Sequence, residues 1–132
     1  MPNRQGSAYC LRKGKDKNIV HDLSDSILID NMPHSEISNI FKTVKVFYSY
    51  DTYTAYSRFA VLCGCESVVI PDDGVDLDDW YPLESDRFGI SYGLDDRDRA
   101  KAKATSALVL PQIEKELADN VSNVSVFVAE IE

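Results

Sequence analysis

The sequence predicts a single α/β domain built on a doubly wound, parallel sheet. Short apolar runs rich in β-branched residues alternate with stretches whose apolar residues fall at helical spacing. The joins between these segments are short and hold Gly, Pro, Asn and Asp. A chain of 132 residues is long enough for one hydrophobic core. Together these observations indicate a Rossmann-like arrangement of strands and helices.

The first part of the chain is predicted to supply two strands. Residues 8–11 form a short strand, which ends before Gly14 and the lysines around it. Residues 19–23 are a weaker candidate for extended structure. Residues 26–30 are a compact apolar run between polar residues, as expected for a buried parallel strand.

An amphipathic helix is predicted over residues 34–44, after a turn at Asn31-Met32-Pro33. Its apolar stripe follows helical spacing: Ile37, Ile40, Phe41 and Val44. Residues 45–49 follow as a strand rich in Val, Phe and Tyr.

A second helix is predicted from Thr52 to Cys63. Asp51 or Thr52 is a suitable N-cap, and Gly64 suits the left-handed position that ends a helix. The β-branched run 66–70 is the next strand, which Pro71 stops.

The remaining segments complete the alternation. Residues 72–86 form a long acidic loop, and residues 87–92 are predicted as a short strand. Residues 95–110 are an alanine-rich helix that ends before Pro111, and a further helix follows over 112–120. In the tail, 121–131, the Val and Ser content favours a strand, but four apolar spacings agree with a helix, which we predict.

Charge is unevenly distributed along the chain. The net charge is −8, yet residues 1–17 hold five basic residues and one acid. We therefore divide the chain into a basic leader or first strand over 1–18 and a Rossmann-like domain over 19–132. The basic residues of the leader are either a partly disordered terminus or a cover for a bound diphosphate, with Arg12, Lys13 or Lys15 over the phosphates. The acidic total argues against nucleic acid as the main partner.

The composition also excludes several classes of protein. No apolar run approaches the ~20 residues that span a bilayer, and residues 1–14 carry no secretory signal. Three cysteines, two of them in Cys63-Gly64-Cys65, give neither a paired disulfide framework nor a four-ligand metal pattern. The acidic loop lacks the spacing of a calcium loop, so we predict no metal site. A reducing cytoplasm fits best.

The most informative segment is the polar turn between residues 50 and 55. It places Asp51, Thr52 and Thr54 after a strand and at the start of a helix, where unpaired backbone N–H groups favour anions. Ligands of open α/β sheets bind at the carboxyl ends of the strands. The alternative for these residue types is ordinary helix capping.

Several segments together resemble the C-terminal, donor-binding domain of the GT-B glycosyltransferases, the retaining nucleotide-sugar enzymes in particular. The resemblance covers about two-thirds of the chain. It lies in the order of these segments: Ile27-Leu28-Ile29, Ser35-Glu36-Ile37, Val46-Phe47-Tyr48-Ser49, Asp51, Leu62-Cys63-Gly64-Cys65, Val68-Val69-Ile70-Pro71, Phe88-Gly89-Ile90-Ser91-Tyr92 and Asp95-Asp96.

The resemblance implies transfer of a sugar from a nucleotide diphosphate sugar, the donor substrate, with no other cofactor. In such a domain Asp51 would lie by the transferred sugar, since a carboxylate beside a diphosphate is repulsive. The phosphates would be held by the following residues: Thr52, Tyr53, Thr54, Arg12, Lys13, Gly74 and His34. The acceptor binds an N-terminal domain in that family, so this chain is expected to be inactive without a separate or missing partner domain.

One position departs from the family. A second acid, eight residues after the first, binds the ribose hydroxyls in the family, and Phe59 stands there in this chain. Phenylalanine cannot accept that hydrogen bond, which favours a second interpretation, a non-catalytic α/β binding or signalling module. Tyr50, Tyr53 and Tyr56 crowd the same region and either stack on a ligand or belong to the core.

Overall fold

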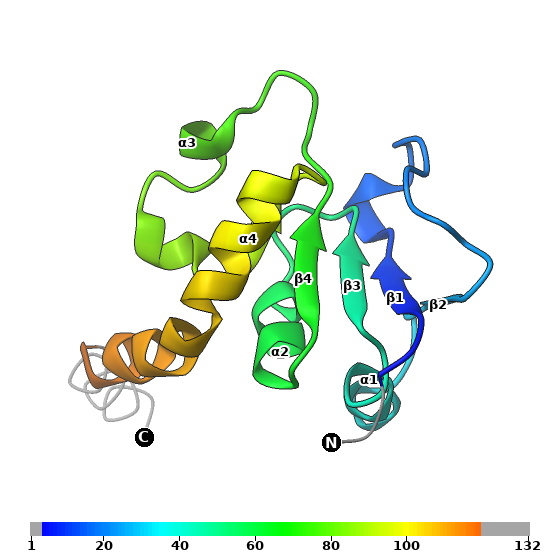
Figure 1. Ribbon diagram of the computed structural model, residues 1–132, viewed down its shortest axis with the longest axis horizontal. Helices are drawn as coiled ribbons and strands as arrows, with labels where there is room; N and C mark the ends of the chain where they lie inside the picture. Colours follow the sequence, from blue (N-terminus) through cyan, green and yellow to red (C-terminus); the bar gives the residue numbers. More distant parts are fainter. Residues whose placement is uncertain (1–3, 120–132) are drawn as a thin grey trace, which may run out of the picture.

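The computed structural model describes residues 4–119, and the predicted tail helix at 121–131 lies outside them. One parallel sheet holds five strands in the order β2-β1-β3-β4-β5 (Figure 1). The strands are β1 (Ser7–Cys10), β2 (Ser26–Leu28), β3 (Val46–Ser49), β4 (Glu66–Val69) and β5 (Ile90–Tyr92). The predicted α/β class with a Rossmann-like parallel sheet is therefore confirmed.

The helices are shorter than the sequence suggested. They are α1 (His34–Phe41), α2 (Tyr56–Leu62), α3 (Leu77–Trp80) and α4 (Asp96–Thr105), with 3-10 turns at Arg12–Gly14, Glu84–Arg87 and Ser106–Leu108. Residues 109–119 are helical as well. The acidic segment predicted as a loop thus contains α3 and a 3-10 turn. The helix that was predicted to end before Pro111 resumes through it, because proline is tolerated in a first helical turn.

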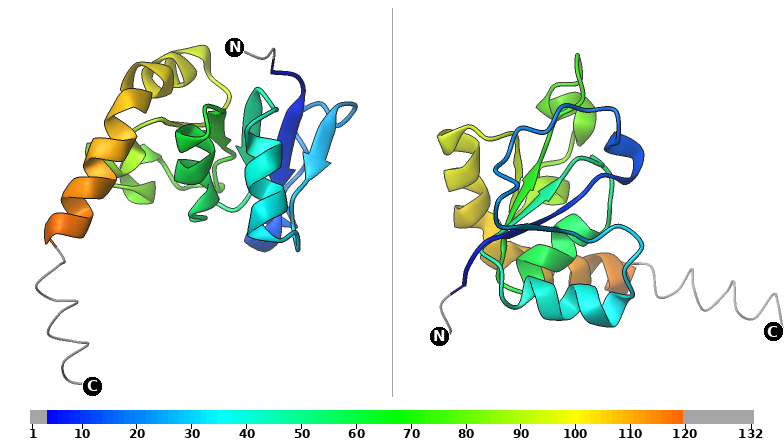
Figure 2. Two further views of the ribbon diagram at one scale, coloured as in Figure 1. Left: turned by 90° about the horizontal axis from the view of Figure 1, so that it is seen from below. Right: turned by 90° about the vertical axis from the view of Figure 1, so that its right-hand side faces the viewer.

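The two faces of the sheet carry different elements. The right-hand view of Figure 2 shows α4 on one side of the strands and α1 and α2 on the other. Phe41 of α1 and Ala60 of α2 are buried against Phe47 and Cys10, which point to that side. On the other side, Arg99 of α4 pairs with Glu66 of β4.

Strand β2 was predicted to be buried, but it is exposed. It pairs with β1 alone at the edge of the sheet, and Ile27 and Leu28 are 42% and 39% exposed. Only Ile29, just beyond the strand, is buried. Residues 19–23, the weak candidate for extended structure, form no strand.

Arg4 fastens the helices of one face to each other. Its guanidinium donates to the carbonyl oxygens of Phe41, the last residue of α1, and of Val44, at 2.7 and 2.9 Å. It also donates to the carbonyl oxygen of Cys63 at the end of α2. Carbonyl groups at helix ends lack partners within the helix, so a buried cation there satisfies several at once. A residue from the predicted leader therefore belongs to the folded body.

The strand order places a switch point between β1 and β3. The chain leaves β1 toward β2, whereas β3 leads in the opposite direction to β4 and β5. Loops that follow β1 and β3 therefore diverge at the carboxyl edge of the sheet, the place where open α/β sheets bind their ligands.

Candidate functional site

The loops after β1 and β2 are joined beside the switch point. Asp30 accepts hydrogen bonds from the backbone N–H groups of Leu11 and Arg12, each at 3.0 Å. Arg12 has a φ of 41°, which turns the chain sharply after β1. Its backbone is thus anchored, while its side chain is exposed.

Three side chains from three different elements meet at this position. The guanidinium carbon of Arg12 lies 5.0 Å from the ring centroid of Tyr56, at the start of α2. The Tyr56 hydroxyl is hydrogen-bonded to Nδ1 of His34, the first residue of α1, at 2.9 Å. Tyr56 is buried, whereas Arg12 and His34 are exposed. We call these three residues the Arg12 cluster; it is a cation–π contact and a hydrogen bond next to each other.

The turn before α2 is more compact than predicted. The helix begins at Tyr56 rather than Thr52. Asp51 is 8% exposed and accepts from the N–H of Tyr53 at 3.1 Å, and the hydroxyl oxygen of Thr54 accepts from the N–H of Tyr56 at 3.3 Å. These bonds are turns between a residue and the second residue after it; the N-cap of α2 is Ala55, and no side chain caps the helix.

Two amides in this turn remain available. Within residues 4–119, no hydrogen-bond partner is found for the N–H groups of Thr54 and Ala55. They immediately precede Tyr56 of the Arg12 cluster.

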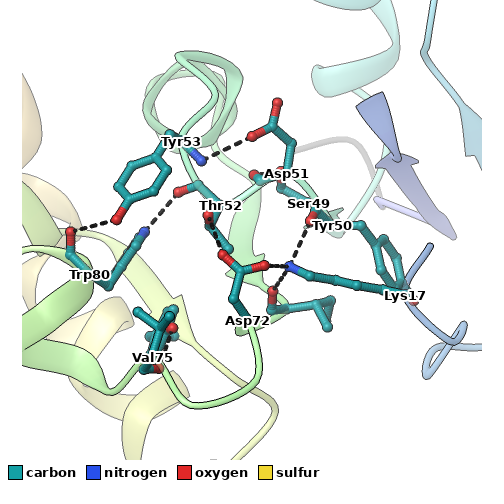
Figure 3. A network of polar contacts seen from close by, with 11 residues as sticks. Lys17, Ser49, Tyr50, Asp51, Thr52, Tyr53, Asp72, Val75 and Trp80 are labelled. Atoms are coloured by element: carbon teal, nitrogen blue, oxygen red, sulfur yellow. Dashed lines mark hydrogen bonds and ion pairs between the residues drawn. The ribbon is translucent and has the colours of Figure 1, made fainter. Parts of the chain in front are cut away.

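Thr52 is buried, and its hydroxyl and carbonyl groups are hydrogen-bonded to other side chains of the protein. It is 6% exposed, its hydroxyl donates to Asp72 at 3.0 Å, and its carbonyl oxygen accepts from the indole N–H of Trp80 at 2.7 Å (Figure 3). Its hydroxyl is thus bonded to a carboxylate, unlike the free phosphate donor expected from the sequence. Tyr53, beside it, is 57% exposed and donates its hydroxyl to the Trp80 carbonyl oxygen at 3.1 Å.

Lys17 holds the carboxyl ends of two strands together. Its ammonium donates to the carbonyl oxygens of Tyr50 and Ile70, both at 2.8 Å, and pairs with Asp72 at 2.7 Å (Figure 3). Hydrogen bonds from Lys17 lower the pKa of Asp72 below its ordinary value, with Thr52 adding to the effect. Lys17 is one of the five basic residues of the leader, and nothing in the local sequence indicates these distant partners.

Lys13 and Gly74 do not take part in the contacts of the Arg12 cluster. Lys13 is exposed and lines a surface pocket of about 510 Å³ together with Lys17, Pro71 and Asp72. Gly74 is exposed in the loop after β4, and no atom lies within 4 Å of the place where its Cβ would be. Within residues 4–119, no hydrogen bond, ion pair or ring contact joins the side chain of Lys13, or Gly74, to Arg12 or His34.

The three tyrosines near the turn have different roles. Tyr50 is fully buried, and its hydroxyl is hydrogen-bonded to the N–H of Val20 and to Nδ1 of His21, so it belongs to the core. Tyr56 belongs to the Arg12 cluster. Tyr53 alone offers an exposed ring, which lies edge-on to Tyr81 at 5.4 Å between centroids.

Phe59 fills the position of the second family acid with apolar contacts. Its ring lies 5.8 Å from that of Phe41 and 6.4 Å from that of Tyr56. The side chain therefore connects α1 and α2 and supplies no polar group to the Arg12 cluster.

The cysteines are structural. Burial raises the pKa of Cys10 and of Cys65 to about 11, so both are thiols at neutral pH. Among residues 4–119, no three His, Cys, Asp or Glu side chains are placed to hold a metal ion. No helix in the same range is long and apolar enough to cross a membrane.

Comparison of the chain with protein-family models, with curated proteins and with solved structures gave no match.

Proposed function

We propose that this domain binds a nucleotide diphosphate sugar and is the donor half of a glycosyltransferase of the GT-B type. The observation that carries the proposal is the Arg12 cluster. It brings an exposed cation and an exposed imidazole to the start of α2, beside the switch point of a parallel sheet. This is the general position of phosphate ligands in doubly wound sheets.

The chemistry of the cluster suits a diphosphate. Arg12 presents a planar fork of donors that matches two phosphate oxygens. The ring of Tyr56 supports the guanidinium from one side, and the unpaired amides of Thr54 and Ala55 add two neutral donors. His34 is a further donor or acceptor on the α1 side.

Asp51 is assigned to the transferred sugar. One carboxylate oxygen is already bonded to the Tyr53 amide, and the carboxylate faces the interior of the turn. A hydroxyl of the sugar would donate to this group, whereas a phosphate would be repelled by it.

Catalysis in this proposal is positioning and charge stabilisation. The bond between the anomeric carbon and the diphosphate oxygen breaks and the diphosphate leaves with the electron pair. The acceptor hydroxyl oxygen forms the new bond to the anomeric carbon, and its proton passes to the departing diphosphate. Arg12 and the two amides would stabilise the departing diphosphate. The acceptor would come with another domain, so the chain by itself should bind the donor without turnover.

A non-catalytic binding module remains the second candidate, and Phe59 favours it. Its packing on Phe41 and Tyr56 removes the ribose contact of the family, so the affinity for a nucleotide would rest on the phosphate contacts alone.

The test is the shift in melting temperature caused by UDP, GDP and their sugars. A ligand that binds only the folded state raises the melting temperature. We expect a rise with at least one nucleotide diphosphate, and Arg12→Gln should weaken the binding by about tenfold or more, because a charge-assisted bond is lost.

Arg97→Gln is the matched control. Arg97 is exposed on α4 and loses the same charge in the same substitution. An equal loss of nucleotide binding in both variants would show that the effect comes from the change in net charge and not from the position of Arg12. No shift with any of these nucleotides would support the binding module instead.

A further inference from the structure

A second pocket adjoins the turn before α2 and does not include Arg12, His34 or Tyr56 in its lining. It has a volume of about 360 Å³ and is lined by the turn before α2, by Ser57 and Arg58 of α2, by the end of α3, and by Asp86 and Glu116. Tyr56 faces α1, whereas the next two residues face this pocket, so the first turn of α2 separates the two places. Thr54 and Ala55, whose amides belong to the proposed donor site, also line this pocket.

The wall of the pocket is held in place by hydrogen bonds. The indole of Trp80 donates to the carbonyl oxygen of Thr52, and the hydroxyl of Tyr53 donates to the carbonyl oxygen of Trp80 (Figure 3). Trp80 also stacks on Tyr92 of β5 at 4.5 Å between centroids. These contacts hold the ring of Tyr53 edge-on to the ring of Tyr81. Tyr53 is 57% exposed, and Tyr81 is half-buried. The pocket is therefore built before any ligand arrives.

Its charges exclude an anion. Arg58 pairs with Glu116 at 3.1 Å and with Asp86 at 3.9 Å, and its guanidinium also donates to the carbonyl oxygen of Ser85 at 3.4 Å. The hydrogen bond from Arg58 holds the pKa of Glu116 below its ordinary value, which favours its carboxylate form. One cation and two anions give the pocket a negative balance, which disfavours a phosphate or carboxylate ligand.

A buried hydroxyl points to a missing partner. Ser57 lines the pocket and is 4% exposed, and its hydroxyl has no hydrogen-bond partner within residues 4–119. Buried side-chain hydroxyls in folded proteins nearly always have a partner. An unsatisfied hydroxyl beside a pocket is a candidate hydrogen-bond partner for a ligand or a water molecule there.

The geometry points to a neutral carbohydrate as the ligand of this pocket. A pyranose has a face of C–H groups and an edge of hydroxyl groups. The C–H face would lie on Tyr53 and Tyr81, and the hydroxyls would reach Asp86, Glu116 and Thr54, which offer acceptors and a donor. The volume admits a mono- or disaccharide unit. The site adjoins the diphosphate contacts at Thr54 and Ala55, but its aromatic and acidic residues are not among those contacts.

The test is a titration of the 132-residue chain with sugars, followed by NMR. The chain has one tryptophan, so the indole N–H of Trp80 gives a single resonance in the pocket wall. Glucose, galactose, mannose, N-acetylglucosamine and maltose are the neutral probes, and glucuronic acid is the charged one. We expect a saturable shift of this resonance with at least one neutral probe, with a dissociation constant on the order of 1 mM, and weaker binding of glucuronic acid.

Two pairs of variants separate binding from folding. Tyr53→Ala should lower the affinity for the sugar by about fivefold or more. Tyr53→Phe keeps the ring and should retain most of this affinity. Arg58→Gln removes the ion pairs that hold the carboxylates of Asp86 and Glu116 and should also lower the affinity for the sugar. Arg97→Gln is the matched control. Arg12→Gln should leave sugar binding unchanged while it weakens a nucleotide diphosphate.

Three results would overturn the inference. They are the absence of a shift with every neutral probe, sugar binding that survives both Tyr53→Ala and Arg58→Gln, and equal or tighter binding of glucuronic acid. None of these depends on whether the chain binds a nucleotide, so the two proposals fail separately.

Discussion

At the scale of single residues, His21 shows how a side chain without an obvious partner in the sequence acquires several. Its ring stacks on Tyr48 at 4.5 Å and 20°, its Nδ1 lies 2.6 Å from the hydroxyl oxygen of Tyr50, and its Nε2 lies 3.0 Å from that of Ser26. The hydroxyl oxygen of Tyr50 accepts from the N–H of Val20, and the hydroxyl proton is then directed at Nδ1 of His21. Nδ1 accepts this hydrogen bond only when it carries no proton, that is, when the imidazole is neutral.

Acid should therefore weaken the fold through His21. Burial lowers its pKa, against a smaller opposite effect of Asp22, so the folded state favours neutral imidazole. The stability that this supplies is complete above the ordinary pKa of about 6.5 and is lost as the pH falls below it. In urea unfolding, the free energy of unfolding should fall between pH 7.5 and pH 5.5, and by less in His21→Gln. Equal losses in both proteins would show that other groups cause the effect.

Lys17 is a second residue whose role comes from distant partners. Lys17→Met should leave two carbonyl oxygens and the carboxylate of Asp72 without their donor, at a cost of about 1–3 kcal/mol in the free energy of unfolding. Lys13→Met, on the same loop and exposed, is the control and should change stability little. Equal midpoints of chemical unfolding would contradict the role assigned to Lys17.

At the scale of elements, the sequence predicted the strands better than the helix starts. The runs of apolar and β-branched residues predicted the ends of β3 and β4 to within one residue, because buried parallel strands are dense apolar runs in the sequence. The start of α2 was predicted four residues too early. Asp51 and Thr54 are good capping residues, but here their oxygens accept from the amides of Tyr53 and Tyr56 in separate turns.

The status of β2 was not predictable from its own residues. Ile27, Leu28 and Ile29 read as a buried strand, yet only the strand order decides that nothing pairs beyond β2. A run of apolar residues does not distinguish an edge strand from a central one.

The end of α2 gives a prediction at this scale. Gly64 has a φ of 98°, and a Cβ there would lie 2.5 Å from a guanidinium nitrogen of Arg4, which joins α1 to α2. Gly64→Ala should therefore cost more than the ~1 kcal/mol of left-handed backbone strain alone.

Gly74→Ala measures that strain by itself. Gly74 also has a positive φ, 76°, but open space surrounds its Cβ position. Thermal unfolding should give a clearly lower melting temperature for Gly64→Ala than for Gly74→Ala. Identical melting temperatures would mean that the contact between Gly64 and Arg4 constrains nothing.

At the scale of the whole molecule, the parallel sheet decides which predicted site residues meet. The sequence placed Arg12, His34 and the turn of Asp51 to Thr54 at the ends of strands, and the strand order brings Arg12 and His34 to Tyr56. Tyr56 was predicted only as one of three crowded tyrosines. Its central position follows from the register between α1 and α2, which the local sequence does not encode.

The pocket with Arg58 was beyond the reach of sequence patterns. Its lining comes from segments as far apart as Tyr53, Tyr81 and Glu116, and each looks like an ordinary surface residue in its own segment. Thr52 shows the opposite case, since its type and position suggested a ligand contact and the fold directs its hydroxyl to Asp72.

The central claim is that the start of α2 and the Arg12 cluster hold the diphosphate of a nucleotide. Backbone amide NMR of the 132-residue chain during titration with UDP and GDP tests it most directly. The account predicts that the largest saturable shifts fall on the amides of Thr54 and Ala55 and on the side-chain resonances of Arg12, and that Arg12→Gln reduces them. Shifts confined to other parts of the sheet, or none at saturating nucleotide, would contradict it.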